Sequence, residues 1–409
     1  MIERVGAQGD GVAEGPLYAP LTLPGERVRA RLAVDRAESI ELLVPSPDRV
    51  APPCPHFGVC GGCALQHWAR GPYVGWKVEQ IRMALARERI DTEFAPPFAA
   101  KPGSRRRLAL HARSDGKGGA IIGFKSRRSW RLVPIDVCPV ADPRLVAAFP
   151  ALQRLASPLF EHPRSAPTLH VTLTDTGLDV DITGVERRTG ALSADARAKV
   201  AEAAAAADLA RVTLDTEILF QARQPIVRVG RAALALPAGA FLQAVADAEA
   251  AMAAFVGEAL AGAARIADLY CGVGAFALRL AERSSITAFD ISAPAVRALA
   301  SAQGGVDGLR SIAAEARDLV RRPVLAADLS RLDAAVIDPP RAGAPDQHRE
   351  LAASRLARIA SVSCNPATFA RDARILTDAG FTLAKLLPVD QFLWSPHIEL
   401  VGLFERRGG

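Results

Sequence analysis

The sequence has no apolar segment that would carry the chain into or across a membrane. Charged residues already stand at positions 3 and 4, so the N-terminus lacks the apolar core of a signal peptide. No apolar run is long and uncharged enough to span a bilayer. Cysteine is scarce as well, with six in 409 residues. These absences predict a cytoplasmic protein without a membrane partner, whose cysteines serve metal binding or catalysis rather than disulfides.

Charge of neither sign dominates the whole chain, but cations gather in one stretch. The net charge of +6 is weak evidence for a polyanionic partner. Between positions 101 and 131, however, ten lysines and arginines stand against a single acid, Asp115. Trp130, Phe124 and His111 lie in the same stretch. The mixture favours RNA contact, through phosphate neutralisation and base stacking, over the alternative of a solvated strand face.

The chain divides into three predicted domains. Residues 1–50 alternate short β-like runs with turn signals, which is typical of a small β-barrel. Residues 51–238 combine a cysteine-rich segment with β-like runs and two helical stretches, and are expected to form a central α+β domain. From 239 to 409, helical stretches alternate with short buried strands. That alternation predicts an α/β domain with a doubly wound parallel sheet.

Within the central range the patterns are specific enough to be checked. An amphipathic helix is predicted over 73–90 and an alanine-rich helix over 193–207. Residues 104–135 read as a β-meander, and 211–219 as one strand.

A glycine turn follows the first buried strand of the α/β domain. The strand Ala264–Leu269 leads to Gly272 and Gly274, and glycines let the backbone approach a ligand closely. Asp290 closes the next predicted strand, where an acid can accept hydrogen bonds from ribose hydroxyls. Ala277 holds the third glycine position of a dinucleotide loop, and no Gly-Lys-Ser/Thr follows. S-adenosylmethionine, which carries no phosphate, therefore fits better than NAD or ATP; the alternative is a plain strand-to-helix turn.

Cys364 is the candidate nucleophile. It follows a predicted strand over 359–363, and a helix expected to start directly after it would lower the thiol pKa. Asp338 follows another predicted strand and begins an Asp-Pro-Pro-Arg turn. A thiolate that adds to carbon 6 of uracil makes carbon 5 able to attack a methylsulfonium. A base must then remove the carbon 5 proton; Glu399 is the candidate and His397 the rival.

At these residues the chain resembles the RNA 5-methyluridine methyltransferase family, and the resemblance extends over essentially the whole sequence. The matching strings are FLQ (241–243), DLYCGVGAF (268–276), DPPRAG (338–343), SCNPATFARD (363–372) and HIEL (397–400). It implies an enzyme with Cys364 as nucleophile and Glu399 as proton acceptor. The implied contacts with S-adenosylmethionine come from Gln243, Tyr270, Asp290 and Asp338. Two departures are Val245, where many members carry Asn, and Asp290 in place of the more usual Glu.

Four cysteines remain once Cys271 and Cys364 are assigned: Cys54, Cys60, Cys63 and Cys138. Four thiols can hold zinc or an iron–sulfur cluster. The second Cys-x2-Cys pair of a zinc ribbon is absent, so the spacing favours a [4Fe–4S] cluster. The resemblance strengthens this, because the four positions match the family's iron–sulfur branch. That branch carries an N-terminal TRAM module, an RNA-binding small barrel that residues 1–48 resemble.

The sequence thus predicts an S-adenosylmethionine-dependent 23S rRNA uracil carbon 5 methyltransferase, acting as a monomer without an obligate protein partner. The runner-up is the same reaction on the T-loop uridine of tRNA, whose enzymes generally lack both the cluster and the TRAM module. A third possibility is a non-catalytic RNA-binding protein with a relic catalytic domain; the intact Cys364 and Glu399 argue against it. The cluster is expected to fix the basic meander in place rather than to take part in the reaction, since methyl transfer moves no net electrons.

Overall fold

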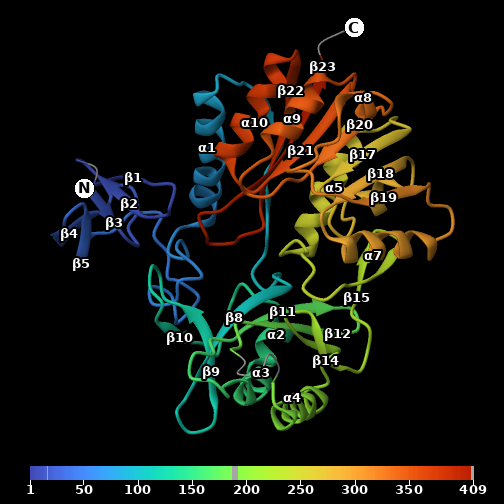
Figure 1. Cartoon of the computed structure of the whole chain (residues 1–409). Helices are drawn as coiled ribbons and strands as arrows, with labels where there is room; N and C mark the ends of the chain where they lie inside the picture. Colours follow the sequence, from blue (N-terminus) through green and yellow to red (C-terminus); the bar gives the residue numbers. More distant parts are fainter. Residues whose placement is uncertain (16, 187–191, 407–409) are drawn as a thin grey trace.

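A computed structural model describes residues 1–15, 17–186 and 192–406 and arranges them in three parts (Figure 1). The N-terminal part is a five-stranded sheet in the order β1-β2-β3-β5-β4. Its strands are β1 (Ile2–Val5), β2 (Gly11–Ala13), β3 (Leu17–Ala19), β4 (Arg27–Ala33) and β5 (Arg36–Val44). Ile2 N donates to Glu26 O at 2.9 Å, and Gly25 N donates to Ile2 O at 2.8 Å. These bonds join β1 to the start of β4, so the sheet curls back on itself as a small barrel does.

The central part packs helices against one seven-stranded sheet, in the order β10-β9-β8-β11-β12-β13-β14. The strands are β8 (Arg107–Ser114), β9 (Ala120–Lys125), β10 (Leu132–Pro134), β11 (Thr168–Thr174), β12 (Gly177–Thr183), β13 (Arg211–Leu214) and β14 (Glu217–Gln221). The helices are α2 (Pro143–Ala147), α3 (Phe149–Ala156), the 3-10 turn η1 (Ser157–Leu159) and α4 (Ala194–Ala206). Leu152 of α3, Val200 of α4 and Val171 of β11 share one apolar core. The predicted meander and alanine-rich helix are therefore present.

The run 211–219, predicted as one strand, is instead a hairpin. Asp215 and Thr216 have positive φ angles of 48° and 74°, a left-handed conformation that reverses the chain. Val212 of β13 then pairs with Phe220 of β14. The apolar pattern continues through the turn, so periodicity alone did not reveal it.

The C-terminal part is a three-layer α/β unit whose main sheet has the order β19-β18-β17-β20-β21-β23-β22-β6, with β7 paired to β22. The strands are β17 (Arg265–Leu269), β18 (Ser285–Asp290), β19 (Ile312–Ala316), β20 (Ala334–Ile337), β21 (Arg358–Ser363), β22 (Phe381–Asp390) and β23 (Glu399–Arg406). The helices are α5 (Ala246–Ala259), α6 (Ala277–Leu280), α7 (Ala293–Gly304), α8 (Ala326–Leu329), α9 (Pro345–Ala353) and α10 (Pro366–Asp378). A short hairpin, β15 (Ile226–Val229) and β16 (Ala232–Ala235), leads into it.

Two separate apolar cores cover the two faces of this sheet. One holds Met252 of α5 and Leu299 of α7, and the other holds Leu351 of α9 and Phe369 of α10. Strand β20 is buried along its whole length, as expected for a central parallel strand covered on both faces. The predicted doubly wound α/β domain is confirmed, with the antiparallel strand β23 as an addition.

Residues from the cysteine-rich half of the chain also join the C-terminal sheet. Helix α1 (Arg70–Arg87) packs its buried Ile81 and Leu85 into the core beside α10. Strands β6 (Glu93–Phe94) and β7 (Phe98–Ala99) pair in parallel with β22. All three fall inside the range 51–238 expected for the central domain, so the chain crosses to the α/β part and back.

A buried ion pair fixes this crossing. Lys77 of α1 is fully buried, and its Nζ lies 2.5 Å from Asp390 Oδ1 and 3.0 Å from Phe392 O. Removing one partner of such a pair leaves an uncompensated charge in the interior, which is strongly destabilising. The pair therefore anchors the loop after β22 to α1. In the part of the chain that the structure describes, every helix is too short or too polar to pass through a lipid bilayer.

Candidate active site

Strand order brings the sequence-predicted motifs to one edge of the sheet. Strands β18 and β20 flank β17 on opposite sides, which makes the carboxyl end of β17 a topological switch point. The glycine turn follows β17, Asp338 follows β20, and Cys364 follows β21. Parallel strands present their carboxyl ends at the same edge, so the three loops converge there.

Register sets the candidate nucleophile against the candidate base. Strand β23 runs antiparallel to β21, and Ser363 pairs with Leu400. The next residue along each chain is therefore Cys364 on one side and Glu399 on the other. Glu399 is buried, whereas Cys364 is partly exposed. The negative charge of Glu399 raises the pKa of the Cys364 thiol. Both groups thus lie at the edge of the sheet where the glycine turn lies.

The thiol pKa differs from the expectation. Helix α10 does begin at Pro366, and the Asn365 side chain caps it by accepting from Ala367 N at 3.1 Å. The pKa of Cys364 is nevertheless raised to about 11, by burial first and then by Glu399 and Asp338. Two carboxylates and partial desolvation outweigh the helix terminus and the nearby Arg341. The expected lowering is therefore wrong for the protein without bound ligands, in which the thiol is protonated at neutral pH.

A buried amide that no motif indicated connects the candidate base, Glu399, to Gln243. Gln391 Nε2 donates to Glu399 Oε1 at 3.1 Å and to Gln243 Oε1 at 2.7 Å. Gln243 Nε2 in turn donates to Asp338 Oδ2 at 3.4 Å. Burial, with Asp338 nearby, raises the pKa of Glu399 to about 8, while the bond from Gln391 opposes the rise. Gln391 follows the end of β22 directly, a position that only the β22–β23 pairing brings near Glu399.

The rival base lies in a different position. His397 is exposed and packs edge-on against Phe392 at 6.2 Å between ring centroids. Burial of part of the ring, together with Arg341 and Lys77, lowers its pKa. It lines the pocket outside Cys364. Glu399 is the group held by the strand register opposite the thiol, so the geometry favours Glu399.

The glycine turn after β17 has the backbone that its sequence requires. Tyr270, Gly272 and Gly274 all have positive φ angles, of 63°, 53° and 93°. A Cβ on Gly274 would lie 2.4 Å from Leu299 Cδ1, so this glycine also allows close packing on α7. A Cβ on Gly272 would meet nothing within 4 Å. Gly272 is therefore needed for its conformation and leaves open space above the turn.

Acidic groups surround the turn. Asp290 accepts from Gly272 N at 2.9 Å and from Ser292 N at 2.8 Å, so it braces the turn; each oxygen keeps a lone pair for a ligand hydroxyl. Burial raises the pKa of Asp268 to about 8 and that of Asp338 to about 7. A cationic ligand favours the ionised form of such carboxyls, so the site suits a cofactor that carries positive charge, as the sulfonium and amino groups of S-adenosylmethionine do.

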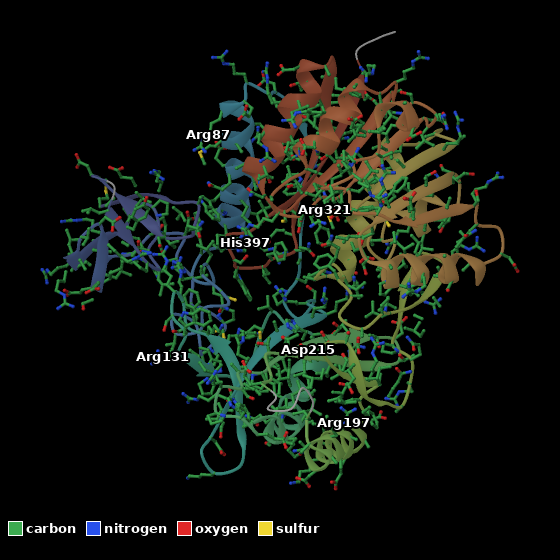
Figure 2. The ribbon with its side chains drawn as sticks, viewed as in Figure 1. Arg87, Arg131, Arg197, Asp215, Arg321 and His397 are labelled. Carbon is green, nitrogen blue, oxygen red and sulfur yellow. The ribbon has the colours of Figure 1, made fainter. Side chains whose placement is uncertain are left out.

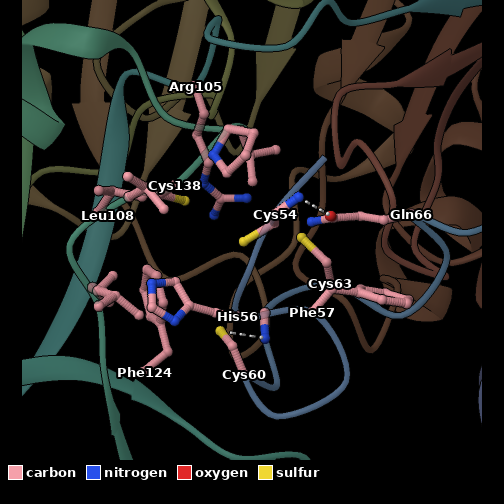
Figure 3. Close-up of a pocket in the computed structure, with 16 residues that line it drawn as sticks. Cys54, His56, Phe57, Cys60, Cys63, Gln66, Arg105, Leu108, Phe124 and Cys138 are labelled. Carbon is pink, nitrogen blue, oxygen red and sulfur yellow. Dashed lines mark hydrogen bonds between the residues drawn. The ribbon is translucent and has the colours of Figure 1, made fainter. Parts of the chain in front are cut away.

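The four remaining cysteines line one cavity of about 260 Å³ between the 54–63 loop and the central sheet (Figure 3). Figure 3 shows Cys54, Cys63 and Cys138 around a shared space with the Arg105 side chain, while Cys60 lies farther away. Cys60 Sγ accepts from Gly62 N at 3.5 Å. Burial raises the pKa of Cys60, Cys63 and Cys138, that of Cys63 to about 12. Within the described ranges no group of three or more His, Cys, Asp or Glu is arranged to hold a metal ion. The four cysteines therefore line the same cavity, but their sulfur atoms are not arranged as the ligands of a metal ion. The iron–sulfur site stays a prediction.

Several cations of the 101–131 stretch are used inside the protein. Arg106 pairs with Glu249 of α5 at 2.6 Å, and Arg127 and Arg128 contact Asp10 of the N-terminal sheet. Phe124 lines the cysteine cavity. Trp130, by contrast, is 86% exposed, with Lys125 Nζ 3.8 Å from its ring centroid. The exposed cations that remain available to a polyanion are Lys101, Arg113, Lys117 and Arg131.

Comparison with known proteins agrees with this geometry. The model of the tRNA (uracil-5-)-methyltransferase family matches residues 200–407. A Caulobacter vibrioides protein described as an uncharacterized RNA methyltransferase is 61% identical over 99% of both chains. A Chromohalobacter salexigens protein described as 23S rRNA (uracil(1939)-C(5))-methyltransferase RlmD is 32% identical, over 99% of this chain and 88% of its own.

Among solved structures, the Pyrococcus abyssi tRNA (uracil-54, C5)-methyltransferase in complex with S-adenosyl-L-homocysteine has a similar fold. The TM-score is 0.75 at 22% identity, over 98% of this chain and 99% of that one. The likeness concerns the fold alone, and it includes all three parts of the chain.

Proposed function

Because this chain belongs to the tRNA (uracil-5-)-methyltransferase family, we propose that it methylates carbon 5 of a uridine in 23S rRNA, with Cys364 as nucleophile and Glu399 as base. The observation that carries the proposal is the pairing of Ser363 with Leu400, which sets thiol and carboxylate opposite each other beside the cofactor turn. S-adenosylmethionine supplies the methyl group as an electrophile. The chain's own residues then have to bind the uracil, add sulfur to it and move one proton.

The reaction needs one nucleophile and one base from the protein. Cys364 Sγ, once deprotonated, bonds to carbon 6 of uracil, and the electron pair moves to the carbonyl oxygen as an enolate. Carbon 5 uses this electron pair to take the methyl group, which would leave the donor as its neutral thioether. Glu399 then removes the proton from carbon 5, the carbon–hydrogen pair reforms the double bond between carbons 5 and 6, and Cys364 leaves as a thiolate. Glu399 must be ionised for its step, and Gln391 stabilises that ionised form by its hydrogen bond.

Replacing Gln391 by leucine is expected to move the rising limb of the pH profile of methyl transfer to higher pH, by up to about one pH unit. Loss of a hydrogen bond worth about 1 kcal/mol makes the ionised carboxylate harder to form. The pKa of Glu399 is already about 8, so activity grows as pH rises through that value, and a higher pKa delays the gain. Single-turnover methylation measured across pH tests this. The pH dependence of covalent trapping on 5-fluorouridine RNA serves as the control, because trapping needs sulfur addition and methyl transfer but no proton removal by Glu399. An unshifted methylation profile would contradict the role of Gln391.

The choice of 23S rRNA rests on the Chromohalobacter relative, which is 32% identical over 99% of this chain. That Chromohalobacter protein is described as acting on 23S rRNA, whereas the family as a whole is named for tRNA. Transcripts of 23S rRNA and of tRNA, each with its uridines replaced singly by cytidine, would decide between them. Methylation of a single rRNA position supports the proposal; methylation of the tRNA T-loop alone overturns it.

We also infer that Cys54, Cys60, Cys63 and Cys138 hold a [4Fe–4S] cluster. All four cysteines line one cavity, and the Arg105 guanidinium that also lines it suits the negative charge of thiolate ligands. Gly61 N donates to Lys125 O at 3.0 Å, so the loop is already joined to the end of β9. A cluster there would fix the basic hairpin, and the small N-terminal sheet beside it would serve as a TRAM-like RNA-binding module.

Changing Cys60 to serine is expected to remove iron and sulfide from the purified protein and to weaken RNA binding several-fold. The reason is that the 54–63 loop loses its link to Cys138, and the hairpin with it. Iron and sulfide content and RNA affinity are the measurements. Cys364→Ser, which removes a thiol elsewhere, should keep its iron. Full RNA affinity in an iron-free Cys60→Ser protein would show that the cluster has no such structural role.

A further inference from the structure

A pocket of about 190 Å³ opens beside Cys364, and segments far apart in the sequence line it. Residues 7 and 8 of the N-terminal sheet form one wall, α1 forms a second, and the loops at Arg341, Cys364 and His397 form the rest. Figure 2 shows Arg87 on α1 and His397 below it, between the N-terminal sheet and the α/β part. The N-terminal sheet thus contributes directly to the surroundings of the nucleophile.

The wall from the N-terminal sheet is held firmly in place. Asp10 is 1% exposed, and Arg36 contacts it from within the sheet while Arg127 and Arg128 reach it from the β9–β10 hairpin. Trp76 of α1 donates from Nε1 to Val5 O at 3.0 Å. The turn between β1 and β2 is therefore fixed to both other parts of the protein. The turn can therefore form a fixed part of the pocket.

Four polar side chains that line this pocket, two arginines and two glutamines, are not used by the described part of the protein, whereas Asn365 caps α10. Across residues 1–15, 17–186 and 192–406, no carboxylate pairs with Arg87 or Arg341, and the side-chain amides of Gln8 and Gln80 make no hydrogen bond. Met83 adds an apolar surface that is 40% exposed. These groups match the parts of a nucleotide. The two free guanidinium groups suit its phosphates, the two free amides suit the edge of its base, and the apolar surface suits the face of its base.

We propose that this pocket binds the nucleotide next to the target uridine, with Arg87 and Arg341 on its phosphates and Gln8 and Gln80 on its base. The inference rests on the proposed function. Carbons 5 and 6 of a stacked uracil are shielded, so the target base must leave its stack to reach Cys364. The strand on either side is then unstacked as well. The nucleotide next to the target then reaches this pocket, which Cys364 also lines. The amides of Gln8 and Gln80 would make the enzyme selective for the base of that nucleotide.

The phosphate contact is tested with Arg87→Ala against Arg297→Ala, an equal loss of charge on the exposed side of α7. The Arg87 variant should bind single-stranded substrate RNA more weakly, and the slope of log affinity against log salt should decrease in magnitude by about 0.7, the amount expected for one lost phosphate contact. Arg297→Ala should keep the wild-type slope. Equal slopes in the two variants would overturn the phosphate assignment.

The base contact is tested with Gln8→Ala and Gln80→Ala, with Gln221→Ala on β14 as the matched control. Each pocket variant should lose about 3- to 10-fold in kcat/KM, the amount of one hydrogen bond, with kcat at saturating RNA retained. Substrates that carry each of the four bases beside the target uridine should show a preference in the wild type that the pocket variants lose. An unchanged preference overturns the inference.

Two readouts separate this inference from the proposed function. If the wild-type protein methylates no RNA, the proposed function fails first. If it methylates RNA and the pocket variants match Gln221→Ala and Arg297→Ala, the function stands and the pocket assignment fails. Binding of S-adenosylmethionine by calorimetry should be the same in all variants. A loss of that binding in Gln8→Ala or Gln80→Ala would mean that the residue acts through the fold, which also overturns the inference.

Discussion

Replacing Cys364 by alanine is expected to lower kcat/KM for RNA methylation by at least about 10⁴-fold, because without the thiol the uracil ring has no route to a nucleophilic carbon 5. The side chain sits at the end of β21, partly exposed to the pocket, so its removal costs little packing. Transfer of a labelled methyl group to substrate RNA is the measurement. RNA that carries 5-fluorouridine at the target should form a covalent complex with the wild-type protein and none with the variant.

Binding of S-adenosylmethionine provides the control for this change. The carboxylates at the glycine turn, Asp290 and Asp338, are untouched by it, so calorimetry should show wild-type affinity for the cofactor. A Cys364→Ala protein that binds the cofactor and still methylates RNA at the wild-type rate would refute covalent catalysis.

Glu399→Gln, which keeps the shape of the side chain, is expected to lower turnover by about 10²- to 10⁴-fold, the usual range for loss of a general base. Sulfur addition and methyl transfer precede proton removal, so the methylated adduct should accumulate on natural RNA. A denaturing gel with labelled RNA would show it as a slowly moving protein band. Wild-type protein should release its product and show little of this band.

His397→Ala is the matched comparison for the base. The histidine lines the outer pocket and is exposed, so its removal should leave turnover far closer to the wild type than Glu399→Gln does. If His397→Ala instead trapped the adduct while Glu399→Gln turned over normally, the roles assigned to the two residues would have to be exchanged.

The sequence predicted that its motifs share one edge of the sheet, because those motifs lie at strand ends. In a doubly wound sheet the loops after β17, β20 and β21 must meet, so recognising three strand-end loops also predicted their proximity. The pairing of Cys364 with Glu399 was less accessible. It depends on the antiparallel strand β23 and its register, which no local pattern around residues 399–406 reveals.

Long-range pairing explains the rest of what the sequence missed. Gln391 stands alone in the chain as an ordinary polar residue, and only the folding of β22 against β23 turns it toward Glu399. Strands β6 and β7 are two residues each, too short for any periodicity. In the basic stretch 101–131 the sequence indicated more cations for RNA than the structure leaves available. Composition cannot distinguish an arginine that faces solvent from Arg106, which pairs with the buried Glu249.

The cluster at Asp10 has a consequence for how salt should act on this protein. One carboxylate meets three guanidinium groups, so it can neutralise only one of them, and Arg128 remains 54% exposed at its side chain. The joint between the N-terminal sheet and the hairpin is thus under internal repulsion whenever no anion is near. A polyanion laid across it would relieve the repulsion and tighten the joint at the same time. Ionic strength should therefore affect the rigidity of the free protein in the same place where it competes with bound RNA.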